Sequence, residues 1–161
     1  MTMSDPEQPV GSASTEPLVN WQAVWRGALI GLCVLAAASI VEAALDHNLD
    51  SFKNSGWIYP LFFSILFGYG LAGWQAGRFA PDGALTNGTL AGVGALVLWI
   101  PVRIVVWLVR DESQGLFTGH NPALRPGQVF GQLVIAAGIG MLGGFLGGRA
   151  AARARARGIT S

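Results

Sequence analysis

Charged residues are scarce in this sequence. Asp, Glu, Lys and Arg make up 12% of its 161 residues, whereas a soluble globular domain normally contains about a quarter. A chain with so few charges has too little polar surface to cover a water-facing globule, and its positive mean hydropathy of +0.47 agrees with that. The scarcity of charge therefore favours a membrane protein. The formal net charge of +1 indicates no preference for acidic or basic partners.

Cysteine and histidine are almost absent as well. Cys33 is the only cysteine, which excludes an intrachain disulfide and a cysteine-based metal cluster. His47 and His120 are the only histidines, and neither belongs to a spacing such as H-x-x-x-H that binds metal. We interpret both as loop residues, with a metal site as the alternative. The serines and threonines of the apolar segments have no histidine nearby in sequence, so we expect no enzymatic activity and no cofactor.

The segment 1–20 lacks an apolar run and contains no Lys or Arg. A secretory signal peptide needs both, so this polar segment predicts a disordered N-terminal tail instead. Each apolar stretch that follows approaches or exceeds the ~20 residues that a helix needs to cross a bilayer. Spanning segments must satisfy their own backbone hydrogen bonds and should be helices. The sequence thus predicts an all-α membrane protein with a four-helix transmembrane domain over 21–150 and a basic tail over 151–161. Its spans are expected at about 22–45, 57–79, 86–109 and 128–149.

Arginine is distributed unequally between the two sides that four spans would define. The N-terminus, the middle loop and the C-terminus share the richer side, which contains Arg26, Arg78, Arg149, Arg153, Arg155 and Arg157. The other side contains Lys53, Arg110 and Arg125, with Arg103 nearby in a span. Because cytoplasmic loops carry the excess of positive charge, we expect both termini in the cytoplasm and the chain in the plasma (inner) membrane of a bacterium.

The arginines that follow the last span invite two interpretations that are compatible. Arg149, Arg153, Arg155 and Arg157 hold the C-terminus inside according to the positive-inside rule. They also attract the anionic lipids of the bilayer, by about 1 kcal/mol for each arginine near the surface. Four arginines without an aromatic or motif context are a weak indication of nucleic-acid binding, and we expect no nucleic-acid partner.

Gly68, Gly70 and Gly73 form a G-x-G-x-x-G pattern, which is typical of dinucleotide-binding turns. That turn follows a strand and precedes an acidic residue by about 20 positions. Here the glycines lie inside a membrane-length apolar stretch, followed only by Asp82. The same spacing recurs in the fourth apolar stretch, and a similar correspondence relates the first and third spans. We therefore predict a tandem repeat of two helical hairpins, related by an axis along the membrane normal.

Glycine serves a physical purpose at these positions. Lipid is as apolar as leucine, so close backbone contact, rather than burial from water, holds helices together. Glycines four residues apart share one helix face. We expect helix packing through Gly27, Gly31, Gly68, Gly73, Gly77, Gly88, Gly92, Gly138, Gly143 and Gly147. A narrow pore or hinge, or a nucleotide-binding turn, are the alternatives.

Glu42 and Arg103 are ionisable residues inside predicted spans. Glu42 follows Gly27 by the same interval as Arg103 follows Gly88, so the repeat places the two at equivalent depths. Charges within a bilayer usually pair or face water. We weigh an interhelical ion pair against two side chains that reach the headgroups separately, with a role in ion or proton passage as a third possibility.

The glycine-rich pattern over residues 20–150 resembles a known class of proteins. "WRGALIG", "GLAGWQAGR" and "NGTLAGVGA" are similar to segments of small four-span bacterial membrane proteins, a class catalogued as uncharacterised. The resemblance implies an integral plasma-membrane protein and supplies no activity or site.

Two functions remain open from the sequence. We expect a non-enzymatic, structural or accessory protein that forms an oligomer with itself or joins another membrane protein. The alternative is a small transporter or channel, for which Gln75 and Gln132 would join Glu42 and Arg103 around a wet cavity. The long segment 110–128 is a candidate for contact with a partner, because long connections are often functional.

Overall fold

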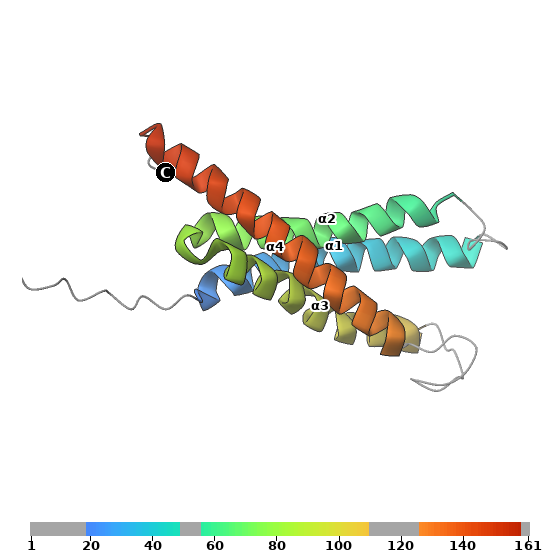
Figure 1. Ribbon diagram of the computed structural model, residues 1–161. Coiled ribbons are helices and arrows are strands. Elements are labelled where there is room, and N and C mark those ends of the chain that lie inside the picture. Colours follow the sequence, from blue (N-terminus) through green and yellow to red (C-terminus); the bar gives the residue numbers. More distant parts are fainter. Residues whose placement is uncertain (1–18, 49–55, 110–125, 159–161) are drawn as a thin grey trace, which may run out of the picture.

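The computed structural model describes residues 19–48, 56–109 and 126–158. These residues form four α-helices and no strand (Figure 1): α1 (Trp21–Asn48), α2 (Ile58–Phe79), α3 (Ala84–Val109) and α4 (Pro126–Ala156), with a short 3-10 helix, η2 (Pro81–Gly83), before α3. The predicted all-α class is confirmed for this part of the chain. Residues 1–18 of the predicted tail, residues 110–125, His120 and the side chain of His47 lie outside the described residues.

Local chemistry accounts for where the helices begin and end. Asn20 caps α1, because its Oδ1 accepts a hydrogen bond of 3.1 Å from the Ala23 N–H. The last turn of α2 closes with a bond from the Ala80 N–H to the Ala76 carbonyl, and Pro81, which has no N–H, then starts η2. Beyond α4, Gly158 adopts a left-handed φ of 67°, the conformation in which glycine commonly ends a helix.

Three segments are long and apolar enough to cross a membrane: α1, the η2–α3 segment and α4. The helix α2 has 22 residues, which corresponds to about 33 Å, so its length is sufficient. It is not among the three segments, because residues such as Tyr59 and Gln75 lower the hydropathy of its apolar stretch. A fourth span therefore rests on the length of α2 and its place in the bundle.

The helices pack around a central pair. Both α2 and α3 contact every other helix, whereas α1 and α4 lie on opposite sides of this pair. Successive helices run in opposite directions, so the start of α1, the α2–α3 turn and the end of α4 lie at one end of the bundle (Figure 1). We call this the basic end and the opposite one the far end. The helix α4 projects beyond the rest of the bundle at the basic end.

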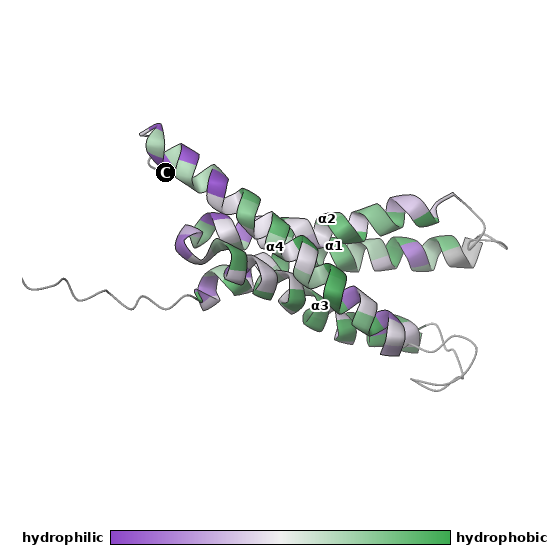
Figure 2. Ribbon diagram, in the orientation of Figure 1, coloured by the Kyte–Doolittle hydropathy of each residue, from purple (hydrophilic) through white to green (hydrophobic). Residues whose placement is uncertain are grey.

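The packing places small residues inside and large apolar residues outside. Eight of the thirteen buried apolar residues are alanines: Ala23, Ala28, Ala38, Ala72, Ala76, Ala91, Ala95 and Ala136. Large apolar side chains face outward on all four helices, among them Phe63, Phe67, Val105 and Phe130, and Figure 2 shows apolar residues along most of each helix. This arrangement matches a surface that contacts lipid rather than water.

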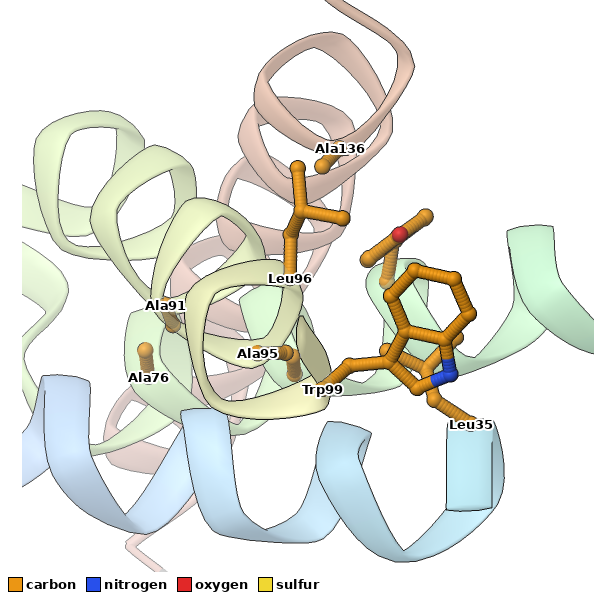
Figure 3. Close-up of a cluster of buried hydrophobic side chains, with 9 residues drawn as sticks. Leu35, Ala76, Ala91, Ala95, Leu96, Trp99 and Ala136 are labelled. Atoms are coloured by element: carbon orange, nitrogen blue, oxygen red, sulfur yellow. The ribbon is translucent and has the colours of Figure 1, made fainter. Parts of the chain in front are cut away.

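Larger core residues are concentrated beyond the alanines and glycines, toward the far end. Figure 3 shows Leu96 of α3 pointing toward Ala136 of α4, and Trp99 pointing toward Leu35 of α1. These residues belong to one buried cluster with Tyr69 of α2. The helices therefore approach most closely near the basic end and are separated by larger side chains farther along.

The helix α4 is longer than the predicted span 128–149. It continues without interruption to Ala156, so much of the segment predicted as a separate basic tail is the last part of this helix. Alanine and arginine are strong helix formers, and residues 149–157 contain no other residue type, so neither glycine nor proline occurs between Gly148 and Gly158. The predicted boundary marks the loss of apolar residues, which does not end the helix.

Candidate functional site

The glycines of α2 and α4 bring the two backbones into direct contact. A Cβ at Gly73 would meet the Gly140 carbonyl, and one at Gly77 would meet the Gly144 carbonyl. The contacts also occur in reverse, because a Cβ at Gly143 would meet the Gly70 carbonyl. At Gly147, a Cβ would meet the Trp74 carbonyl in the same way. No side chain larger than hydrogen fits at these four positions without moving a helix.

The helix α3 meets α4 through a second glycine face. A Cβ at Gly88 would lie 2.6 Å from the Gly144 Cα, and one at Gly92 would meet the Ala136 carbonyl. On the side of α4, Gly140 and Gly144 fill this interface. Gly140 and Gly144 were both absent from the predicted packing residues, although Gly140, Gly144 and Gly148 repeat at intervals of four, a spacing that indicates a second face.

The contacts of α1 involve alanine, and those at Gly31 and Gly68 are less tight than the contacts between α2 and α4. A Cβ at Gly27 would meet the Ala72 carbonyl of α2 and lie 3.1 Å from the Ala91 Cβ of α3. At Gly31 it would lie 3.0 Å from the Ala95 Cβ, and at Gly68 it would lie 3.3 Å from the Val34 Cβ. Alanine thus shares the role of glycine where α1 packs on α2 and α3.

Gly138 differs from the other predicted packing residues. A Cβ there would meet nothing within 4 Å among the described residues, and the same holds for Gly127 and Gly131 on α4. Because a helix turns by about 100° per residue, Gly131 and Gly138 lie on the face of α4 opposite Gly140. The structure therefore brings nine of the ten predicted glycines into contacts of the chain with itself and leaves Gly138 on the surface.

A polar ladder joins α1 to α3 in the far half of the bundle. Its first rung is a buried hydrogen bond of 2.7 Å, which the Trp99 Nε1–H donates to the Ser39 Oγ. Its second rung is the ion pair of Arg103 and Glu42, with Nη1 3.3 Å from Oε2. The guanidinium of Arg103 also lies over the Trp99 ring, with its Cζ 5.4 Å from the ring centre. The structure thus brings Glu42 and Arg103 together, with both side chains partly exposed.

Asn87 forms a third polar junction that the sequence did not indicate. Its side chain is buried, its Oδ1 accepts a bond of 2.8 Å from the Asn20 N–H, and its Nδ2–H donates to the Gly83 carbonyl. It therefore ties the start of α1 to the α2–α3 turn. Neither this residue nor the Ser39–Trp99 bond had a sequence signal, because the partners are far apart in the chain.

Three arginine–aromatic pairs lie near the basic end. Arg26 lies over the Phe79 ring, with its Cζ 5.5 Å from the ring centre. Arg78 and Arg149 each lie over the aromatic residue four positions earlier, Trp74 at 5.3 Å and Phe145 at 5.2 Å. Such cation–π contacts place a charge beside an apolar ring without an acidic partner. Arg153 and Arg155, farther along α4, and Arg157, directly after it, are exposed.

Two shallow pockets occur on the surface of the described residues. A pocket of about 400 Å³ at the basic end, which we call the basic pocket, is formed by the α2–α3 turn, the start of α3 and the end of α4. A mostly apolar groove of about 520 Å³ lies between α1 and α2 toward the far end and includes Cys33, Pro60 and Ser64. Neither is lined by Glu42, Arg103, Gln75 or Gln132.

Two polar atoms in the far half are buried without a hydrogen-bond partner among the described residues. They are the Nε1 of Trp107 and the Oε1 of Gln132. No group of three potential metal-ligating side chains is found in the same part of the chain. Trp107 and Gln132 do not belong to the polar ladder.

No protein-family model matches the chain, and no curated protein or solved structure is significantly similar to it.

Proposed function

We propose that this protein is a non-enzymatic, structural or accessory component of the bacterial inner membrane, which it crosses four times with both termini in the cytoplasm. The observation that carries the proposal is its inverted packing. Glycine and alanine occupy the helix interfaces and large apolar side chains cover the outside. In lipid, such interfaces hold helices together through close contact.

The four-span topology is supported by the arrangement of the helices and their charges. The helices pack against their neighbours in alternating directions. If α1, α3 and α4 cross the bilayer, α2 therefore crosses it as well. Six described arginines belong to the basic end, where Asp82 is the only described acidic side chain. The positive-inside rule assigns that end to the cytoplasm.

The tandem repeat is supported by reciprocal contacts between α2 and α4. A Cβ at Gly73 would meet Gly140, and a Cβ at Gly143 would meet Gly70. In the repeat, Gly70 is equivalent to Gly140 and Gly73 is equivalent to Gly143. Exchanging the two hairpins therefore turns the first contact into the second. A two-fold axis between the hairpins would produce this reciprocity.

The ion pair of the polar ladder agrees with the same symmetry. Glu42 and Arg103 contact each other, and the interval between them in the sequence equals the interval between Gly27 and Gly88. The repeat therefore makes Glu42 and Arg103 equivalent residues. Equivalent residues meet only near a two-fold axis, which places this pair close to the axis that the glycine contacts suggest.

Association with a second copy or another membrane protein is supported by the glycines that the bundle leaves free. Gly138 and Gly131 occupy the outer face of α4 with nothing near them among the described residues. A partner helix packed there would gain the close approach that α2 and α3 gain on the other faces.

A matched pair of substitutions tests this association. We expect Gly138→Leu to reduce the particle mass of the protein purified in mild detergent, or to release a co-purified partner, while the helicity and stability of the chain persist. Met141→Leu serves as the control, because it also places a leucine on the exposed surface of α4 nearby but replaces a large side chain instead of a glycine. A monomeric wild-type protein without a stoichiometric partner would contradict the proposal.

Transport is the alternative function, and the polar ladder is the observation that favours it. The ladder, however, lies between α1 and α3, and Gln75 and Gln132 do not join it. Solute flux through liposomes that contain only this protein, lost in a Glu42→Ala variant, would replace the structural proposal with transport.

A further inference from the structure

The basic end carries more positive charge than its described acids can neutralise. Arg26, Arg78 and Arg149 lie on aromatic rings, and none of them forms an ion pair with a described carboxylate. Arg153 follows Arg149 by four residues on the projecting part of α4 and extends the same helix face, and Arg157 comes directly after the helix ends at Ala156. The excess charge is complementary to an anionic partner at the membrane surface.

The basic pocket provides a specific place for such a partner. Arg149 and Thr86 line it from α4 and α3, and Leu85 and Phe145 provide apolar walls. Phe145 lies one turn farther from the end of α4 than Arg149, on the side of the bilayer. The pocket therefore combines a cation and a hydroxyl with apolar side chains, which are the two kinds of contact that a phospholipid requires.

Thr86 adds a hydrogen-bond donor to the positive charge. Its side chain is exposed, and its hydroxyl bonds to no other described residue, in contrast to the Thr89 hydroxyl, which donates to the Leu85 carbonyl. Asp82 also lines the pocket, and its charge opposes an anion. The affinity of the pocket for an anionic ligand therefore depends on the positive charge of Arg149 and of the arginines that follow it.

We propose that the basic pocket binds the headgroup of an anionic phospholipid. The Arg149 guanidinium and the Thr86 hydroxyl bind the phosphate, and an acyl chain lies against Leu85 and Phe145. The inference requires only that the bundle is inserted in a membrane, so it holds whether or not the protein associates with a partner.

Native mass spectrometry of the purified protein tests the proposal with phosphatidylglycerol and phosphatidylcholine supplied in equal amounts. We expect one tightly held phosphatidylglycerol for each chain and no comparable phosphatidylcholine. Arg149→Gln should weaken this binding by tenfold or more, because it removes a charge-assisted hydrogen bond. Arg149→Lys, which keeps the charge, should restore most of it.

Two further variants distinguish a site from diffuse attraction. Arg157→Gln removes the same charge outside the pocket and should weaken binding by no more than about fivefold. Thr86→Val removes the hydroxyl and leaves the charge unchanged. If the lipid is held only by diffuse electrostatic attraction, its affinity should not change. If it binds in the basic pocket, its affinity should fall.

Three results would overturn the proposal. They are equal binding of both lipids, equal losses for Arg149→Gln and Arg157→Gln, or an unchanged affinity in Thr86→Val. Displacement of the lipid by a short DNA duplex would assign the arginines to nucleic acid instead. Circular dichroism of each variant shows that a loss of binding does not come from a loss of helix.

Discussion

Replacing Gly73 by alanine should push α2 away from α4. The new Cβ would meet the Gly140 carbonyl oxygen, and it would lie 2.7 Å from the carbonyl carbon and 2.8 Å from the Cα of Gly140. All three atoms belong to the backbone, so no side-chain rotation relieves the overlap. The Cβ needs at least 0.7 Å more room for the carbonyl carbon to move from 2.7 Å to the 3.4 Å of an ordinary contact. The oxygen, which is closer, needs more, and the two helices must supply this room.

The expected cost follows from this displacement. A gap of about 0.5–1 Å already loses a quarter to a half of the dispersion energy of each contact, and inserting a methyl into a packed core typically costs about 1–3 kcal/mol. The better helix propensity of alanine opposes this by at most about 1 kcal/mol. We therefore expect Gly73→Ala to lower the free energy of unfolding by about 1–2 kcal/mol.

Gly70→Ala is the matched control, three residues away on the same helix. Its Cβ would lie 3.6 Å from the Ile139 Cγ2, an ordinary contact, so this variant should be as stable as the wild type or up to about 1 kcal/mol more stable. Unfolding by sodium dodecyl sulfate in mixed micelles, followed by circular dichroism, measures both. Equal stability of the two variants would show that the α2–α4 contact is not the close backbone contact described above.

Three further outcomes are expected. Glu42→Ala and Arg103→Ala should each lower the free energy of unfolding. A double-mutant cycle should give a coupling energy of about 0.5–1 kcal/mol, as for other partly exposed pairs. If exchanging the two charges restores none of the lost stability, the ion pair is ruled out. Ser39→Ala should cost about 1–3 kcal/mol, because it leaves the buried Trp99 Nε1–H without an acceptor, and should cost much less in a Trp99→Phe background. A reporter enzyme fused after Ser161 should be active in the cytoplasm, and activity outside the cell would reverse the topology.

The sequence predicted the helices well because their signals are local. Apolar length alone located α1, α3 and the start of α4, each within a few residues. The spacing of four that links Gly73 to Gly77 also indicated which residues share a face, since helix geometry fixes that relation. The end of α4 was missed because composition marks the edge of the apolar layer, whereas backbone chemistry decides where a helix stops.

The pairing of helices was less accessible from the sequence. Which glycine faces inward depends on neighbours far away in the chain, so Gly138 and Gly143 looked alike although only Gly143 meets another backbone among the described residues. The partners of Asn87 and Trp99 were hidden for the same reason. The pairing of Glu42 with Arg103 was one of three open alternatives, and the repeat was the feature that suggested it.

The positions of the glycines and of the polar ladder have one physical cause. Where Gly27 and Gly31 face Ala91 and Ala95, α1 and α3 are close enough for dispersion between small groups to hold them. Farther along, Trp99 and other larger residues occupy the core and keep the helices apart. Only long side chains bridge that distance, and the hydrogen bond of Trp99 and the ion pair of Arg103 do so. Shortening Arg103 should therefore weaken the far half of the bundle and leave the glycine contacts of the basic half intact.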